Sequence, residues 1–230
     1  MIRIAQMPAS ITGDFITAVV FCAREKLRVF KEYPLGKYER REKRTERATA
    51  IKYLVPLAEK DRSALDELLS RLRKLKYTSY EFRRGEQGFG DGYFLGSTLP
   101  LIMSANTREK WDIGRYIVKL PVMGVLNRDL GMFTMRPAIE YPEAVQAFHP
   151  HHTQRGTCWS QWQYSVTEAC GFCNFDQLFG IFILFLQSYY PGSPLARPPE
   201  YGETRDAGEN MYWMQKLSEE EAIRISKRRV

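Results

Sequence analysis

The stretch FHPHHTQRGTCWSQW, residues 148–162, carries most of the reactive side chains of this 230-residue chain. Together with CGFC at residues 170–173, it contains all three histidines, three of the four cysteines and two of the four tryptophans. Thiols and imidazoles serve as nucleophiles, as acid–base groups and as metal ligands. Their concentration here favours a chemical role, and two kinds of site are compatible with it.

The first kind of site is a cysteine nucleophile. Cys158 would lie on an exposed loop, with His149, His151 or His152 close enough to lower its pKa or to orient an acyl group. Residues 141–173 would then form an extended flap between a sheet and the helix that follows. The expected chemistry is attack of the Cys158 thiolate on an acyl group.

The second kind of site is a structural zinc ion. Cys170 and Cys173 form a Cys-x-x-Cys pair, and His151 and Cys158 could complete a tetrahedral set. A single pair of this spacing is a weak signal, so both interpretations stay open at this point. In this hypothesis a structural zinc ion stabilises the domain, and the protein is associated with nucleic acid.

Ordinary packing accounts for part of the same cluster. Free cysteine is among the most buried residue types, so Cys22 and Cys170 are expected in the core. His152 is expected to be a solvated loop residue. Four aromatic side chains are expected to pack the loop onto the following helix: Trp159, Trp162, Phe172 and Phe175.

The net charge of +7 comes from 34 basic and 27 acidic side chains, but it is unevenly distributed. Residues 24–52 hold 11 Lys and Arg against 5 Glu, a local net charge of +6. Residues 137–196 hold one Arg against four acidic residues, a local net charge of −3. The basic segment could bind nucleic acid, whereas the reactive stretch is not a cationic phosphate groove.

The periodicity of apolar residues predicts an α+β fold. Helices are expected within residues 14–60, at 63–76 with Ser63 as cap, and at 175–188. Short strands are expected at 77–83, 93–95, 115–122 and 132–139, which together form a meander of about four antiparallel strands. A final short helix should open at Ser218, with Glu221 completing a capping box.

Location and cofactors are also expectations from sequence. The N-terminus has no apolar run of signal-peptide length, and the longest apolar stretch, residues 178–186, is about half the ~20 residues that span a bilayer. Four unevenly spaced cysteines do not form a secreted disulfide framework. We therefore expect a cytoplasmic protein without membrane attachment and without a cofactor.

A family resemblance rests on the order of these motifs. His149-Pro150-His151, a turn closing at Gly156, Cys158-Trp159, a long apolar helix and then Tyr190-Pro-Gly-Ser-Pro-Leu195 resemble the ubiquitin-conjugating enzymes. Their pattern is His-Pro-Asn, a turn, Gly-x-x-Cys-Leu, a helix and a Pro-Asp-Asp-Pro-like stretch. The leading helix, the four-strand meander and Tyr141-Pro142 extend the similarity over roughly residues 61–215, and it looks closest to divergent prokaryotic and phage relatives.

The resemblance implies a role for each matching residue. Cys158 would accept the carboxyl terminus of a ubiquitin-like modifier as a thioester, and His151 would stand where the family has its oxyanion-binding asparagine. His149 matches the histidine that braces the loop. At Gly192-Ser193 the family's acidic residue is missing, and the Gly156 to Cys158 spacing is one residue short. The implied partners are a modifier, its activating enzyme and other protein subunits.

The predicted organisation is a basic helical extension at 1–60, a ubiquitin-conjugating-enzyme-like domain at 61–215 and a C-terminal helix or tail at 216–230. The leading functional hypothesis is conjugation of a ubiquitin-like protein. The first alternative is a catalytically inactive domain of the same fold that binds proteins or joins an assembly. The second is the zinc-stapled, nucleic-acid-associated protein.

Overall fold

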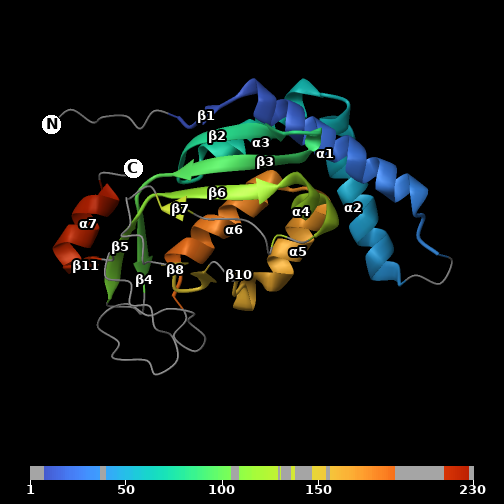
Figure 1. The fold of residues 1–230 in the computed structure, drawn as a ribbon. Coiled ribbons are helices and arrows are strands. Elements are labelled where there is room, and N and C mark those ends of the chain that lie inside the picture. The colour runs from blue at the N-terminus through green and yellow to red at the C-terminus, as the bar shows by residue number, and fades with distance from the viewer. Residues whose placement is uncertain are drawn as a thin grey trace.

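The computed structural model describes residues 8–36, 40–104, 109–128, 130, 136–137, 147–153, 156–189 and 215–227. The fold is α+β, as predicted, with helices packed on an antiparallel sheet (Figure 1). Among the described residues, no helix combines the length and the apolar character needed to cross a membrane.

The main sheet has five strands in the order β1-β2-β3-β6-β7. Their bounds are β1 Ser10–Ile11, β2 Tyr77–Gly85, β3 Gly88–Thr98, β6 Tyr116–Pro121 and β7 Arg136–Pro137. The pairs β2–β3, β3–β6 and β6–β7 are antiparallel, which confirms the predicted four-strand antiparallel arrangement. Strand β1 adds a short parallel edge beside β2.

Two smaller sheets were not predicted. One has the order β11-β5-β4, with bounds β4 Leu101–Ser104, β5 Lys110–Gly114 and β11 Gln215–Leu217. Two of its strands, β4 and β5, lie between β3 and β6 in the chain and so interrupt the meander. The other has the order β10-β9-β8, with bounds β8 Ala147–His149, β9 His152–Thr153 and β10 Gly156–Thr157, and it carries the reactive stretch.

Three helices lie between β1 and β2 in the chain, in the region where the sequence predicts helices. They are α1 Gly13–Glu32, α2 Arg41–Ala58 and α3 Arg62–Arg73. The cap of α3 is Asp61, whose Oδ1 accepts a hydrogen bond from Ala64 N at 2.8 Å, so the prediction of Ser63 as cap is wrong. Asp61 takes this role because its carboxylate reaches the N–H of the third helical residue, which has no partner within the helix.

Helix α6, Phe175–Gln187, crosses one face of the main sheet (Figure 1). Asn174 caps it by accepting from Gln177 N. Phe94 from the sheet lies 4.6 Å from Phe175, ring centroid to centroid, and the Tyr77 hydroxyl donates to Phe179 O at 3.0 Å. Each fully buried phenylalanine stabilises the fold by about 2–3 kcal/mol, so this aromatic layer fixes α6 on the sheet.

Helix α1 contributes to the same core as the sheet. Phe15, Ala18 and Cys22 are fully buried, and the Phe15 ring lies 5.2 Å from Phe94 and 6.3 Å from Phe175. The domain boundary at residue 60 stays a prediction, but the side chains before and after it belong to one hydrophobic cluster. The predicted final helix is α7, Glu219–Lys227, and Ser218 and Glu221 form the expected capping box.

Candidate functional site

The loop that carries Cys158 is a miniature antiparallel sheet rather than an open flap. His149 pairs with His152 across β8 and β9, and Thr157 pairs with His152 across β10 and β9. Cys158 follows β10 directly, and its backbone N–H donates to the His151 carbonyl at 2.8 Å. The chain therefore folds back so that Cys158 lies beside the histidine turn.

His149 ties this loop to helix α6. Its side chain is fully buried, its Nδ1 accepts from the His151 backbone N–H at 3.2 Å, and its Nε2 lies 3.1 Å from Leu186 O. Because Nδ1 is an acceptor, the ring proton belongs on Nε2, which donates to Leu186 O. Burial lowers the pKa of His149 well below its usual value, so the ring is neutral at pH 7.

His151 and Cys158 line one small pocket. The other lining residues are Trp159, Gln161, Trp162, Phe185 and Ser188. The His151 side chain is buried, with its ring centroid 6.0 Å from Tyr189 and 6.3 Å from Phe185. The structure thus brings together the thiol and the imidazole that the sequence singled out. Sequence reasoning missed Ser188, Phe185 and Gln161, because residues that only line a pocket carry no motif.

Cys158 is the accessible thiol of the chain. It is half-buried, whereas Cys22, Cys170 and Cys173 are completely buried, which confirms the expectation for Cys22 and Cys170. Burial raises the pKa of Cys22 well above its ordinary value and that of Cys173 to about 11. A reagent in solution therefore meets Cys158 first.

The structure does not assemble the zinc set. No three His, Cys, Asp or Glu side chains in the described part of the chain are grouped so that they could hold a metal ion. Cys170 and Cys173 end the helix α5, Gln163–Phe172, and interact electrostatically with Lys26 of α1, while His151 and Cys158 line the pocket beside α6. The four predicted ligands thus belong to two different places.

Two further expectations for this region need correction. His152 is buried, not solvated: it pairs with Thr157 across β9 and β10, its Nδ1 lies 2.7 Å from Thr157 Oγ1, and burial lowers its pKa to about 4. The predicted flap over 141–173 is wrong for 163–172, which form α5. Burial of Val166 and Ala169 against the core stabilises this helix.

The expected packing of the loop onto the helix is confirmed for Trp159. Its ring centroid lies 5.4 Å from Phe182 and 5.1 Å from Phe185, both on α6. This packing holds the residue after Cys158 in place, beside the pocket that Cys158 lines. Tyr141-Pro142 and the stretch 190–195, including Gly192-Ser193, lie outside the described residues.

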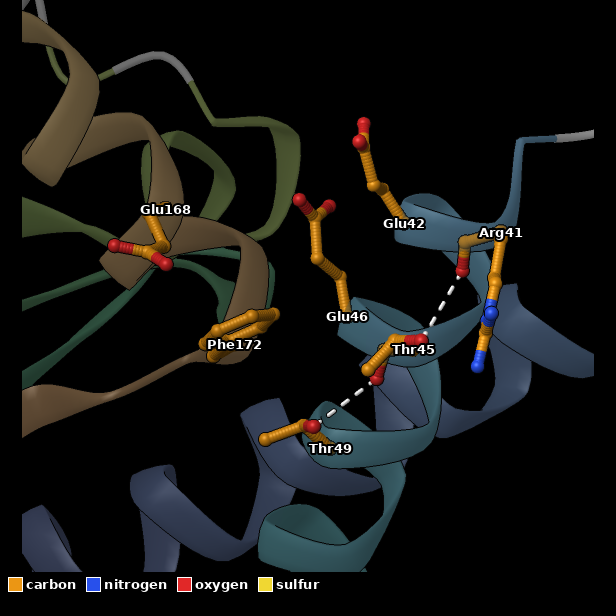
Figure 2. Close-up of a pocket in the computed structure, with 7 residues that line it drawn as sticks. All are labelled: Arg41, Glu42, Thr45, Glu46, Thr49, Glu168 and Phe172. Atoms are coloured by element: carbon orange, nitrogen blue, oxygen red, sulfur yellow. Dashed lines mark hydrogen bonds between the residues drawn. The ribbon is translucent and has the colours of Figure 1, made fainter.

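A separate groove of about 530 Å³ lies between α2 and α5. Figure 2 shows Glu42 and Glu46 extending from α2, with Glu168 and Phe172 across from them on α5. The hydroxyls of Thr45 and Thr49 donate to carbonyls one turn back in their own helix. This groove contains carboxylates and no thiol or imidazole among its lining residues, so it is distinct from the Cys158 pocket.

No protein-family model, curated protein or solved structure matches this chain. The resemblance to ubiquitin-conjugating enzymes therefore stays a prediction, and the site must be judged by its own geometry.

Proposed function

We propose that the protein transfers the carboxyl terminus of a ubiquitin-like modifier, with Cys158 as the acyl acceptor. The observation that carries the proposal is the shared pocket of Cys158 and His151 at the end of a braced hairpin. Such a reaction needs an accessible thiol and a hydrogen-bond donor fixed near the reacting carbonyl. A catalytic free thiol suits a reducing compartment, so the proposal includes a cytoplasmic location.

The first step is a thioester exchange. The Cys158 thiol gives its proton to solvent, and the resulting thiolate attacks the acyl carbon of the modifier, which is held as a thioester on its activating enzyme. A new S–C bond forms, the old S–C bond breaks, and the activating enzyme's thiolate takes up a proton from solvent. ATP is consumed earlier, in forming that activated thioester.

The second step delivers the modifier to an amine. The neutral amine nitrogen attacks the thioester carbon, the carbonyl oxygen becomes negatively charged, and collapse of the intermediate releases the Cys158 thiolate as the amide forms. A proton leaves the nitrogen to solvent. We assign His151 to donate a hydrogen bond to the transient oxyanion, and His149 to position His151 through its hydrogen bonds to the backbone and α6.

The direct test uses the full chain with an activating enzyme, ATP and a ubiquitin-like modifier. We expect an adduct that thiol reductants release, that is absent in Cys158→Ala and that persists in Cys170→Ser, the buried-thiol control. His151→Ala should slow transfer about 100-fold, while His151→Asn should retain much of it, since asparagine can donate to an oxyanion. Absence of an adduct with every ubiquitin-like modifier tested would instead favour the inactive binding module.

A smaller probe avoids dependence on the modifier's identity. A peptide thioester ending in glycine should exchange with Cys158 and add the peptide mass to the wild-type protein only. Tyr164→Ala, an exposed residue of α5 outside this pocket, is the control and should react at the wild-type rate. Equal labelling of wild type and Cys158→Ala would contradict the assignment of the nucleophile.

A further inference from the structure

The ends of α1 and α2 form a strongly basic surface. We define the basic tip as residues 28–36 and 40–47, which hold seven Lys and Arg against three Glu. In Figure 1 the C-terminal end of α1 and the N-terminal end of α2 project beyond the edge of the main sheet. The tip therefore carries a net charge of +4 within a chain whose total is +7.

Each acidic residue of the tip is either paired or lines the groove toward α5. Glu32 forms an ion pair with Arg28 within α1. Glu42 and Glu46 line the groove toward α5, and in Figure 2 Arg41 extends from α2 away from both of them. The tip also presents five exposed basic side chains, of which Arg41 lies at the groove as well: Lys31, Arg40, Arg41, Lys43 and Arg44.

Hydrogen bonds between the two helix ends give the tip a defined shape. Arg47 Nη1 donates to Tyr33 O at 2.8 Å, and Arg44 Nη2 donates to Gly36 O at 3.2 Å. The Arg47 guanidinium also lies 4.7 Å from the centre of the Phe30 ring. The side chain of Tyr33, the residue whose carbonyl accepts the Arg47 hydrogen bond, is 72% exposed.

We infer that the basic tip binds single-stranded nucleic acid, with its arginines and lysines on the phosphates and Tyr33 stacked on a base. Charge complementarity favours a polyanion, and arginine matches phosphate oxygens with two parallel hydrogen bonds. An exposed aromatic ring among basic residues is the arrangement that captures unpaired bases. This inference is independent of the chemistry at Cys158, because it uses no residue of that pocket.

The test measures fluorescence anisotropy of a labelled 20-nucleotide RNA, the same DNA strand and its duplex, each titrated with full-length protein at several salt concentrations. We expect micromolar binding that weakens steeply with salt. The variant R40Q/R41Q/K43Q/R44Q should bind at least about 10-fold more weakly at 100 mM salt. The slope of log affinity against log salt concentration should become shallower by about 0.7 for each phosphate of the single strand that the variant no longer neutralises.

The matched control removes four positive charges elsewhere on the surface, R62Q/R73Q/K74Q/R115Q, so both variants have the same net charge. It should bind within about three-fold of wild type, since the charges near the bound strand dominate at these salt concentrations. Equal losses of affinity in the two variants would overturn the inference. The double variant R40Q/R41Q leaves the Arg44–Gly36 hydrogen bond in place. Its thermal unfolding should be unchanged, and it should show part of the loss of affinity seen in the quadruple variant.

Stacking is tested by Tyr33→Ala against Tyr164→Ala, since Tyr164 is equally exposed at 71% but lies on α5. Tyr33→Ala should weaken single-strand binding about five-fold or more, and Tyr164→Ala should not. Equal affinities for these two variants would overturn the stacking role. If polyglutamate of matched charge binds as tightly as RNA, the occupant is an acidic protein surface and the inference fails.

Discussion

The Nε2 atom of His149 donates a hydrogen bond to the carbonyl oxygen of Leu186, 37 residues later in the chain. This hydrogen bond links the last turn of α6 to the hairpin of β8 and β9, which carries the three histidines. The same ring accepts the His151 N–H, so one buried imidazole fixes both the helix end and the backbone beside the candidate nucleophile. Several measurable consequences depend on this relationship.

Replacing His149 with alanine should loosen the hairpin. The Leu186 carbonyl and the His151 N–H would be left without this partner inside the protein, so the free energy of unfolding should fall by about 2–4 kcal/mol. Urea unfolding measures this decrease, and Gln161→Ala should stay within about 0.5 kcal/mol of wild type. An unchanged urea midpoint for His149→Ala would show that the hydrogen bonds of His149 do not stabilise the fold.

Buried neutral histidines should make the protein sensitive to acid. The folded pKa of His152 is about 4, against about 6.5 in an unfolded chain, so between these values the unfolded chain binds more protons. The contribution of His152 to stability is complete above pH 6.5, is lost progressively down to pH 4 and totals about 3 kcal/mol. His149 acts in the same direction.

Unfolding free energies between pH 5 and 6.5 measure this effect. Wild type should lose stability with falling pH by roughly 1.4 kcal/mol per unit for each of His149 and His152. His152→Gln keeps a polar group near Thr157 and should reduce the slope by about half. The same slope in wild type and His152→Gln would exclude His152 as a source of acid sensitivity.

Thiol labelling should be selective in the native state. Iodoacetamide at pH 8 should add one group to the wild-type protein, because Cys158 is partly exposed and the other three thiols are buried. Cys158→Ser should remain unlabelled, while Cys170→Ser should still gain one group. Intact-protein mass spectrometry measures the outcome, and rapid labelling of Cys158→Ser would contradict the burial of the remaining cysteines.

Two glycines of β3 should respond differently to alanine. A Cβ on Gly96 would lie 2.7 Å from ring carbons of Phe179 and Tyr77, whereas a Cβ on Gly90 would have no atom within 4 Å. Gly96→Ala should therefore cost about 1–3 kcal/mol through overpacking, and Gly90→Ala should stay within about 0.5 kcal/mol of wild type. Thermal unfolding compares them, and equal melting temperatures would mean that α6 is not seated on β3.

The helices and the main strands could be predicted because each satisfies a local rule. Helix α3 has its leucines on one face, α6 is apolar with Asn174 at its cap, and β2 alternates buried aromatic and exposed polar residues. Helix α5 escaped prediction because Gln163–Phe172 contains a glycine and lacks a continuous apolar stripe. Its stability comes from burial in the folded core, which no local pattern encodes.

The candidate site was predictable in its chemistry but not in its surroundings. The clustering of histidine and cysteine singled out His149, His151 and Cys158, which the structure places on one hairpin. The burial of His152 was unpredictable, because a one-residue change of register in a strand reverses which side chains face inward. Separation of the two cysteines of α5 from Cys158 likewise depends on long-range packing.

Strand β11 completes its sheet against β5, although about 100 residues separate them in the chain. At a synthesis rate of about 5–20 residues per second, β11 is made roughly 5–20 s after β5. Until then β4 and β5 form a two-stranded hairpin, which is marginally stable alone and exposes an unpaired edge. In newly made chains the edge of β5 at residues 110–114 therefore lacks its partner for seconds, and such an edge can pair with a strand of another chain.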